Sequence, residues 1–469
     1  MEKNNQNLPL GWTEIPFHDA VTKIPLTGKK LKQKNYQKSG KFPVIDQGQQ
    51  FIGGYTDNSS LKLVCELPVI IFGDHTRVFK FAEQDFVPGA DGIKVIKPYK
   101  FFIPKLFYYF SHAIKFPKKG YARHYQHLEK SLIRIPPLNE QKRIVTKIED
   151  LFSELEYSIE NLNKIKIQLK QYHRSFLNNA FNGELTKTWR EIHKTELKTS
   201  STLAVKIQEE KKKITIKKFE EIGPLELSNL PKLPLGWNWI YLDSLLLDAR
   251  YGTSTKCREE STGIPVIRIP NIISGKIDYS DLKYAESNEK NLESVLIRDN
   301  DLLICRTNGS LSLIGKTAIA NNITSKIAFA SYLIRLRPNN DLANSSYLNF
   351  IMEADIVRRV IEKRARTTAG QYNLNLDILR SIIIPHCSLE EQTVIISNIE
   401  LTSSLISYLN DIVVRNTIHI VKLRQTILQT AFKGKLVPQD PNDEPASVLL
   451  EKIKQEKELQ IKNTKSKSR

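Results

Sequence analysis

The amino-acid sequence predicts an α/β protein with a pseudo-twofold internal repeat, in which two globular α/β modules are separated by two long antiparallel coiled-coil helices. Three observations lead to this prediction. The chain has 469 residues, of which 40% are hydrophobic and 26% charged, so it is long enough for two to four ordinary domains. Short motifs occur twice in the same order, and each half carries a long apolar seam with helical spacing.

Three motifs define the repeat. The first motif is Leu8-Pro9-Leu10-Gly11-Trp12, and it returns as Leu233-Pro234-Leu235-Gly236-Trp237. The second is Leu138-Asn139-Glu140-Gln141, which returns as Leu389-Glu390-Glu391-Gln392. The third is Ala180–Leu185, which returns as Ala431–Leu436. From the motif glutamine to the motif alanine there are 39 residues in both halves, whereas from the tryptophan to the glutamine there are 129 in the first half and 155 in the second. A constant length beside modules of variable length predicts a spacer whose dimension matters.

The first module, residues 1–137, is predicted to be mixed α/β with many short strands. An apolar run typical of a buried strand, Leu67–Phe72, ends at the polar turn Gly73-Asp74-His75-Thr76-Arg77. Such a turn is suited to present Asp74, His75, Thr76 and Arg77 to base edges in a DNA groove. It would equally satisfy its own backbone as an ordinary tight turn, so both interpretations stay open. Arg123-His124 is a second group of the same kind.

Residues 138–185 are predicted to form the first long helix. Pro136-Pro137 precedes it, Gly183 lies at its end, and the seam contains neither glycine nor proline. Apolar residues advance in alternating steps of four and three, which is the a/d pattern of a coiled coil. The seam residues of this helix are Ile144, Ile148, Leu151, Leu155, Leu162, Ile165 and Leu169.

Residues 186–232 are predicted to be a linker with a short charged helix near Leu203–Lys211. The second module, residues 233–387, again has an α/β pattern. Its apolar run Asp301–Cys305 ends at Arg306-Thr307-Asn308-Gly309-Ser310. Arginine can contact guanine bidentately and asparagine can contact adenine, so the candidate DNA-binding residues of this module are Lys256, Arg268, Asn271, Arg306 and Asn308.

Residues 388–437 are predicted to form the second long helix, and residues 438–469 a C-terminal amphipathic helix with a basic tail. The second seam comprises Ile395, Ile399, Ile406, Leu409, Val413, Ile420 and Leu423. Matching seams within one chain favour pairing of the two helices with each other. Packing of each seam on its own module, or pairing across a dimer, are the alternatives. Asn416 either fixes the register of the pair or lies at a solvated edge.

The charge of the chain favours a polyanionic partner. There are 70 Lys and Arg against 51 Asp and Glu, a formal net charge of +19 and an isoelectric point near 9.5. Residues 1–137 hold 21 basic and 11 acidic residues, so the excess is concentrated in the first module. Nucleic acid is the first candidate partner and an anionic membrane surface the second; a charge that only serves solubility is the plain alternative.

Several classes of protein are excluded by what the sequence lacks. No apolar run is long enough to span a bilayer, and the first residues do not resemble a secretory signal, so we expect a cytoplasmic protein without membrane contact. The four cysteines are too far apart for a disulfide framework or a zinc site, and we expect no metal site. Gly309–Thr317 is one residue too long between its glycines for a phosphate-binding loop. We therefore predict no catalytic residues.

The order of module, long helix, module and long helix resembles the specificity subunit of type I restriction–modification systems. The resemblance covers nearly the whole chain. Its most specific residues are Pro136–Gln141, Ala180–Thr186 with Trp189-Arg190, Leu389–Gln392, and Ala431–Pro438 continuing to Asp443–Ala446. The chain departs from the family pattern at Pro385-His386-Cys387-Ser388, where a double proline is usual.

The resemblance implies that each module is a target recognition domain reading one half of a bipartite, asymmetric double-stranded DNA site. The paired helices would set the spacer between the half-sites. The chain itself would bind no cofactor; two methyltransferase subunits would bind S-adenosylmethionine, and two motor–nuclease subunits would use ATP and Mg. A free-standing DNA-modifying enzyme and a non-catalytic coiled-coil adaptor are the alternative functions.

Overall fold

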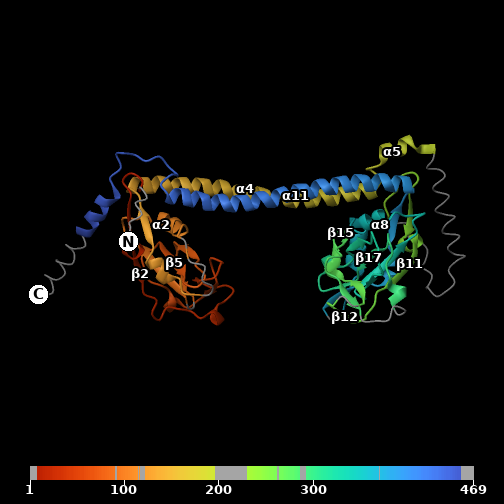
Figure 1. The fold of residues 1–469 in the computed structure, drawn as a ribbon, viewed down its shortest axis with the longest axis horizontal. Helices are drawn as coiled ribbons and strands as arrows, with labels where there is room; N and C mark the ends of the chain where they lie inside the picture. The colour runs from red at the N-terminus through yellow and green to blue at the C-terminus, as the bar shows by residue number, and fades with distance from the viewer. Residues whose placement is uncertain are drawn as a thin grey trace. The chain divides into compact units, whose positions relative to one another are not determined.

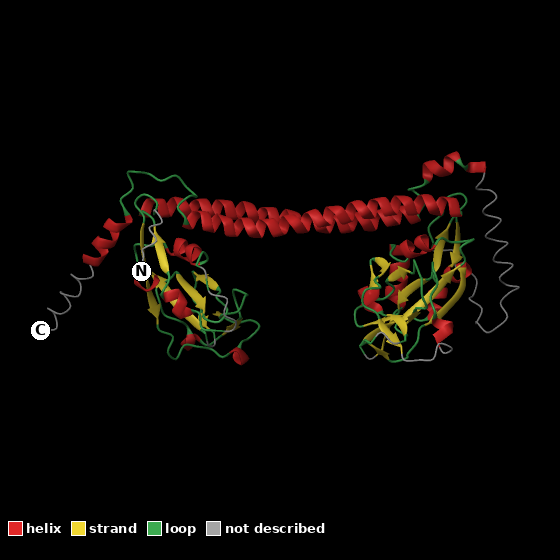
Figure 2. Cartoon of the chain, viewed as in Figure 1, coloured by secondary structure: helices red, strands yellow, loops and turns green. Residues whose placement is uncertain are grey.

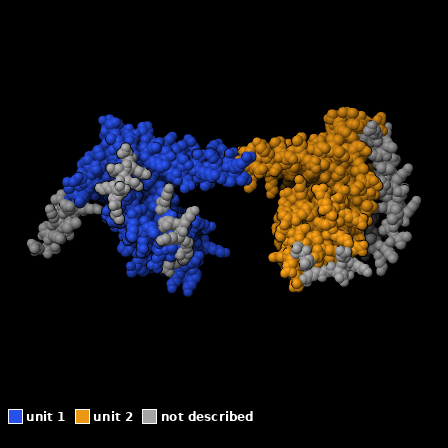
Figure 3. Space-filling view, viewed as in Figure 1, with its two compact units in different colours: residues 1–163, 414–469 blue, residues 164–413 orange. Residues whose placement is uncertain are grey.

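The computed structural model describes residues 8–89, 92–114, 116, 122–195, 230–260, 263–285, 292–368 and 370–455. The chain divides into two compact units, residues 1–163 with 414–469 and residues 164–413 (Figure 3). Both long helices continue from one unit into the other, so each unit contains part of each helix (Figure 1). Each unit is described separately below.

The first unit contains two small sheets and one strand pair around short helices (Figure 2). A four-stranded antiparallel sheet has the order β2-β8-β5-β6, a three-stranded sheet has the order β4-β3-β7, and β1 pairs with β9. The elements are β1 Thr13–Pro16, α1 Phe17–Ala20, β2 Val21–Ile24, β3 Phe42–Ile45, β4 Gly54–Thr56, β5 Val69–Gly73, β6 Phe79–Ala82, β7 Val87–Pro88, β8 Ile93–Pro98, α2 Pro104–Ser111, α3 Tyr125–Glu129 and β9 Leu132–Ile135.

Strand β5 is buried on both faces, and this explains its unbroken apolar sequence. Successive side chains of a strand point to opposite faces of the sheet. Accordingly, Ile70 and Phe72 belong to the core under helix α2 and the long helices, whereas Val69 and Ile71 belong to a second core on the other face. The strand therefore ends as a rigid, fully packed element immediately before the polar turn.

The second unit repeats this arrangement with more strands. A six-stranded sheet has the order β11-β21-β17-β19-β15-β14, a four-stranded sheet β12-β16-β13-β20, a three-stranded sheet β18-β23-β22, and β10 pairs with β24. The elements are β10 Asn238–Tyr241, β11 Leu246–Tyr251, β12 Cys257–Arg258, β13 Ile264–Ile267, β14 Ile272–Ile273, β15 Gly275–Ile277, β16 Lys283–Ala285, β17 Leu302–Cys305, β18 Thr307–Asn308, β19 Thr317–Ile319, β20 Ala328–Phe329, β21 Leu333–Pro338, α8 Ser345–Ile351, α9 Asp355–Arg364, β22 Arg366–Thr368, β23 Gln371–Asn373, α10 Leu376–Arg380 and β24 Ile383–His386.

Strand β17 takes the place of β5 in this unit. Leu302 and Ile304 face the core under α8 and the long helices, and Leu303 and Cys305 face the second core. The α/β modules predicted from the sequence are therefore confirmed in both units.

The two long helices are α4 (Leu138–Phe181) and α11 (Leu389–Phe432), each of 44 residues. At 1.5 Å per residue, each is about 66 Å long. In the first unit the beginning of α4 lies against the end of α11, with Glu156 and Arg424 3.3 Å apart. In the second unit the end of α4 lies against the beginning of α11, with His173 and Ser403 3.2 Å apart. The predicted antiparallel intramolecular pair is confirmed in each unit.

The seam differs from the prediction at its flanks. Most seam residues are buried or half-buried, but Ile165 and Leu423 are 41% and 37% exposed, while Phe152 and Leu177, which were not predicted, are buried. The reason is that a straight α-helix drifts by about 20° per heptad relative to a strict seven-residue repeat. Asn416 is exposed, which favours the solvated edge over a role in register.

The helix ends carry the predicted glycines. Gly183 and Gly434 both have positive φ, of 84° and 67°, and a Cβ at either position would collide with a proline, Pro234 in the second unit and Pro9 in the first. Helix α4 stops at Phe181, four residues before the predicted end, and α5 (Lys187–Ile192) follows it. The predicted helix near residues 203–211 and the basic tail lie outside the described residues. Residues 446–455 are helical.

The repeated motifs fasten each module to the long helices. Trp12 donates its indole N–H to Glu140 Oε2 at 2.9 Å, and Trp237 donates to Glu391 Oε2 at 2.8 Å. The buried glutamine that follows each glutamate donates to two backbone carbonyls and accepts from the N–H at the start of a module helix, namely Ile103 for Gln141 and Asn344 for Gln392.

Candidate nucleic-acid interface

The polar turn after β5 is held rigidly. Gly73 N–H donates to the carbonyl of Val78 at 2.9 Å, and Arg77 N–H donates to the carbonyl of Gly73 at 2.8 Å. Thr76 Oγ1 donates to the backbone carbonyl of Gln47 at 2.7 Å, and the ring of His75 lies 3.3 Å from Gln47 Oε1. The backbone of Arg77 is left-handed, with φ of 62°, and its side chain is exposed. A left-handed non-glycine residue is uncommon and marks a constrained position.

The structure brings the two predicted groups of the first module together. The carbonyl of Asp74 accepts a hydrogen bond from His124 N–H at 2.9 Å, and Asp74 Oδ1 accepts one from Tyr125 N–H at 2.7 Å. Arg123 is exposed beside this joint. The strand-end turn and the segment before α3 therefore form one surface.

Two of the predicted residues lie beneath that surface. Asp74 is 6% exposed and His124 is fully buried. The Asp74 carboxylate anchors Tyr125, as noted above, and the His124 ring contacts the ring of Phe116. Both side chains therefore support the turn from below. The predicted residues of this module that are exposed or half-exposed are His75, Thr76, Arg77 and Arg123.

The second module has the same joint with different side chains. The carbonyl of Arg306 accepts from Leu374 N–H at 2.8 Å, so Arg306 and Leu374 take the places of Asp74 and His124. The Arg306 guanidinium lies 4.5 Å from the centre of the Tyr251 ring and donates to the carbonyl of Ser331 at 3.2 Å. A cation stacked on an aromatic face is held in orientation. Asn308 Oδ1 accepts from Ser310 N–H at 2.9 Å, the local turn anticipated as the plain alternative.

The other predicted residues of this module differ in availability. Lys256 is exposed. Arg268 is half-buried and donates to the carboxylate and the carbonyl of Asp281, both at 3.2 Å. Asn271 is 2% exposed. Its side-chain oxygen accepts a hydrogen bond from Arg268 N–H, and its side-chain nitrogen donates to the carbonyls of Asp278 and Asp281. Asn271 thus organises its own loop.

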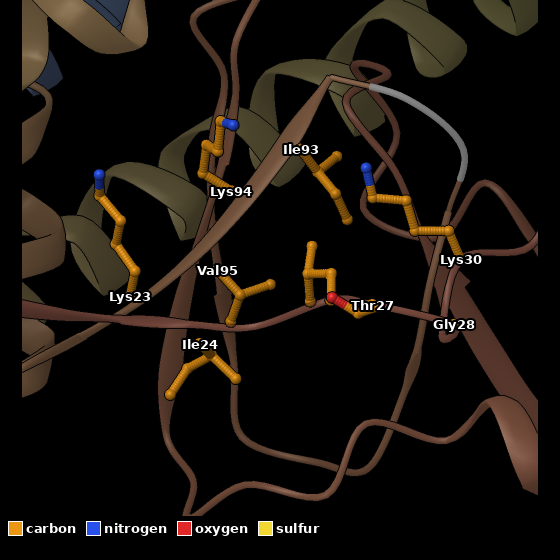
Figure 4. Close-up of a pocket in the computed structure, with 9 residues that line it drawn as sticks. Lys23, Ile24, Thr27, Gly28, Lys30, Ile93, Lys94 and Val95 are labelled. Atoms are coloured by element: carbon orange, nitrogen blue, oxygen red, sulfur yellow. The ribbon is translucent and has the colours of Figure 1, made fainter.

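A basic cavity of about 500 Å³ adjoins β2 and the beginning of β8 in the first module (Figure 4). Lys23, Lys30 and Lys94 surround the apolar side chains of β2 and β8 in this view. The ammonium groups of Lys23 and Lys94 lie 4.9 and 5.7 Å from the centre of the Tyr125 ring. Lys23 also forms an ion pair with Glu129.

A second basic cavity, of about 610 Å³, adjoins β11 and β21 of the second module. Its cationic lining is Arg250, Arg298, Lys326, Arg335 and Arg337, and its acidic lining residue is Glu293. Sequence reasoning missed this group and the lysines of the first cavity. The available signal was the alternation of arginine with apolar residues in Leu333–Pro338, which is unusual for a buried strand.

Two carboxylates stabilise the buried arginines of this cavity. Asp248 accepts two hydrogen bonds from Arg250 at 2.7 Å and also binds Arg335. Asp301 accepts two from Arg337 at 2.7 Å, and these bonds raise the pKa of the Arg337 guanidinium. Burial lowers the pKa of Arg335. Burial would raise the pKa of Asp248, but the hydrogen bonds from Arg250 and Arg335 outweigh it and lower that pKa.

Within the residues that the structure describes, no three His, Cys, Asp or Glu side chains are placed to hold a metal ion. No helix of that part of the chain is both long enough and apolar enough to cross a bilayer.

The family model for the type I restriction modification DNA specificity domain matches this chain twice, over residues 9–171 and 236–410. The chain belongs to this family. Each match covers one module together with the adjoining part of a long helix. The two copies of the specificity domain are therefore the two halves of the repeat, and the family resemblance predicted from the motifs is confirmed.

Relatives with known names are also specificity subunits. The chain is 27% identical over 337 residues to the EcoKI specificity subunit of Escherichia coli strain K12, covering 69% of this chain and 64% of that protein. It is 24% identical over 493 residues to the StySPI specificity subunit of Salmonella potsdam, covering 97% of both. The match thus spans just under two thirds of the EcoKI subunit and nearly all of the StySPI subunit.

Solved structures show the same fold. A chain from a structural study of complex assembly and conformational transition in a type I restriction–modification system aligns with a TM-score of 0.58 at 17% identity, covering 91% of this chain and 99% of that one. The HsdS subunit from Thermoanaerobacter tengcongensis aligns with a TM-score of 0.50 at 17% identity, covering 93% and 100%.

Proposed function

We propose that this specificity-domain chain is the DNA-binding subunit of a type I restriction–modification complex and that each module reads one half of a bipartite, asymmetric site. One observation supports this most directly. Both modules place a polar turn at the end of a fully buried strand and tie it to an equivalent downstream segment, yet the turns present different side chains. In the first module the buried Asp74 supports the turn from which Arg77 extends, whereas in the second module Arg306 itself occupies the equivalent position and stacks on an aromatic ring. An equal scaffold with unequal contact residues suits two different half-sites.

The chain reads the site and performs no chemistry on it. Arg306 and Arg77 are the side chains best placed for base contacts, because each extends from a constrained turn. Arg123 precedes His124, whose N–H binds the turn, and Lys256 lies five residues after Tyr251, on which Arg306 stacks. Both side chains are exposed and are suited to phosphate contacts. Methyl transfer, with S-adenosylmethionine, and ATP- and Mg-dependent translocation and cleavage belong to partner subunits.

The long helices determine the spacer between the half-sites. Their equal length of 44 residues and their antiparallel pairing within each unit support this role. About 34–36 Å, one turn of duplex, separates the reading centres of many dimeric DNA-binding proteins. A helix of about 66 Å can bridge that distance and still have its ends buried in the modules.

Two methyltransferase subunits dock on the helices, and two motor–nuclease subunits complete the assembly in the cytoplasm. The helices carry more exposed apolar side chains than a solvated helix pair requires, which is typical of a protein-binding surface. These side chains are Tyr157, Val414, Ile418 and Val421 in the first unit, and Ile167, Tyr172, Leu401, Leu405 and Tyr408 in the second.

Selection of duplexes from a randomised library by the full-length chain tests the proposal. Two short conserved blocks at a fixed spacing are expected. A single block, or none, would contradict the reading of a bipartite site and favour a coiled-coil adaptor. Methyl transfer from S-adenosylmethionine by the pure chain would instead favour a free-standing modifying enzyme.

Insertion of one heptad into both helices tests the spacer. Seven residues add about 10 Å and nearly preserve the rotational phase of each helix. The preferred spacer should lengthen by about three base pairs while both half-sites stay the same, since B-DNA rises about 3.4 Å per base pair. An unchanged spacer in the selected duplexes would refute this role of the helices.

A further inference from the structure

We infer that the basic cavity of each module binds a backbone phosphate of the DNA next to its half-site. This inference rests on the proposed function, and it assigns a second contact surface to each module, separate from the strand-end turn. Both cavities adjoin a pair of strands that is equivalent in the two repeats, β2 with β8 in the first module and β11 with β21 in the second.

The second cavity contains a charge arrangement that calls for an anion. Arg250 and Arg335 stand directly opposite each other on β11 and β21. Like charges in this cross-strand position are destabilising. Asp248 and Asp301 balance two of the three guanidinium groups of Arg250, Arg335 and Arg337.

Three strand guanidinium groups thus share two carboxylates, which leaves a net positive charge in the group, and the rim adds further charge. Arg298 contributes a further cation there, and its side chain is exposed, so a phosphate can reach it from solvent. Arg335, by contrast, is 1% exposed and lies at the base of the site, where desolvation strengthens its attraction for an anion.

The first cavity has fewer cations, and it adjoins the residues of β8 that pair with the end of β5. Lys94 lies two residues after Gly92, whose carbonyl accepts a hydrogen bond from Asp74 N–H at 2.6 Å. Lys23 and Lys94 both lie over the Tyr125 ring, and the backbone N–H of Tyr125 binds the Asp74 carboxylate. The aromatic ring orients both ammonium groups without neutralising them, and Lys23 is in addition paired with Glu129.

In the second module, consecutive residues of β11 serve the turn and the cavity. Tyr251 supports the Arg306 guanidinium, and Arg250 lines the cavity. The cavity therefore begins one residue from Tyr251, the residue on which the Arg306 guanidinium stacks. Lysine and arginine are the usual ligands of DNA backbone phosphates.

The salt dependence of DNA binding tests this assignment. Lys94→Ala removes an exposed cation from the first cavity and Arg298→Ala one from the second. Arg298 meets the arginine–carboxylate network through its backbone N–H, which donates to Asp301 Oδ2 at 2.8 Å and which the substitution keeps. Lys276→Ala is the matched control, because Lys276 is exposed on β15, three strands away from β21, and carries the same charge.

Each cavity variant of the full-length chain should reduce the slope of log K against log salt by about 0.9, and the double variant by about 1.8. The ratio of affinities for the selected duplex and a scrambled duplex should stay the same, because phosphate contacts carry no sequence information. Lys276→Ala should leave the slope at its original value.

Three results would overturn the inference. An unchanged slope in both variants would show that neither cavity meets the DNA. A loss of discrimination between duplexes would make the residues base contacts. Binding of inorganic phosphate without DNA that is lost in the variants, together with an unchanged slope, would show a site for a free anion. Failure of the proposed function can be distinguished from these results, because the unsubstituted chain would then select no bipartite motif from the duplex library.

Discussion

The two junctions between a module and the long helices use the same tryptophan–glutamate hydrogen bond but differ in how the carboxylate is completed. In the second unit, Glu391 Oε1 accepts hydrogen bonds from Thr186 Oγ1 at 2.6 Å and from Arg190 Nη1 at 2.7 Å. In the first unit, Glu140 Oε1 is buried and has no hydrogen-bond partner among the described residues. The same motif thus builds a buried ion pair in one half and an incompletely satisfied carboxylate in the other.

The sequence explains this difference. The repeat offset of 251 residues between the helices places Val437 where Thr186 stands and Pro441 where Arg190 stands. The segment after α11 therefore lacks both donors that the segment after α4 supplies. Burial raises the pKa of Glu140, and the hydrogen bond from Trp12 only partly offsets this. The comparison shows that the repeat preserves the tryptophan–glutamate hydrogen bond but not the donors to the second carboxylate oxygen.

The largest expected effect is that of Arg190→Ala. It leaves the Glu391 carboxylate, which is 0% exposed, buried without its cationic partner. Removal of one partner of a buried ion pair costs about 3–5 kcal/mol. We expect the urea midpoint of the second unit to fall, as measured by pulse proteolysis with mass-spectrometric assignment of the fragments, while the midpoint of the first unit stays the same.

Lys452→Ala is the control for this measurement. It breaks the ion pair with Glu444, in which both side chains are more than half exposed, and exposed pairs contribute about 0–1 kcal/mol. Equal effects of Arg190→Ala and Lys452→Ala would mean that the second junction does not depend on its buried ion pair.

Substitution of the arginine in each strand-end turn should give the next largest effect, on the discrimination between DNA sequences. Arg306→Ala should weaken discrimination in the half-site read by the second module by about 1–3 kcal/mol, the usual value of a bidentate base contact. Arg77→Ala should act in the same way on the other half-site only. Competition binding with duplexes mutated in one half-site at a time separates the two. A uniform loss across all duplexes would identify the arginine concerned as a phosphate contact.

The sequence predicted the repeated architecture well because its signals are local and periodic. The seams, the glycines after the helices and the constant 39-residue interval predicted two helices that prove equal in length and paired within each unit. A strict heptad could not predict Phe152 and Leu177 in the seam, because the helix follows 3.6 residues per turn.

The side chains around the turns were harder to place, since their surroundings come from distant segments. The burial of Asp74 depends on Tyr125, 51 residues later, and the network of Arg335 depends on Asp248, 87 residues earlier. Polar residues at a strand end therefore predicted where the surface would be, but not which of them would support it from below.

Glu140→Gln tests the weaker junction through its pH dependence. A carboxyl group with a raised pKa holds its proton more tightly in the folded unit, so that unit loses stability as pH rises from the ordinary glutamate pKa, near 4.5, through the raised value. The glutamine variant should therefore raise the free energy of unfolding of the first unit at pH 7 by on the order of 1 kcal/mol, which is measured as a higher urea midpoint. It should also remove this part of the pH dependence of the unit's stability. Glu391→Gln should have the opposite sign, because it deprives Arg190 of its charge partner.

The smallest expected effect is that of Val437→Thr, which gives the first junction a hydroxyl where the second has Thr186. Val437 is half-buried in the core of the first unit, so a hydroxyl there needs a partner. Because the equivalent Thr186 donates to Glu391, we expect the unpartnered Glu140 Oε1 to be the acceptor. A hydrogen bond to a charged acceptor should stabilise the unit by less than about 1 kcal/mol, because the methyl group that is lost offsets part of the gain. The urea midpoint of the first unit should rise slightly at pH 7, and the gain should disappear in the background of Glu140→Ala. If Val437→Thr destabilises the unit equally with and without the Glu140 carboxylate, the two junctions differ in packing as well as in their donors, and the repeat equivalence does not extend to this position.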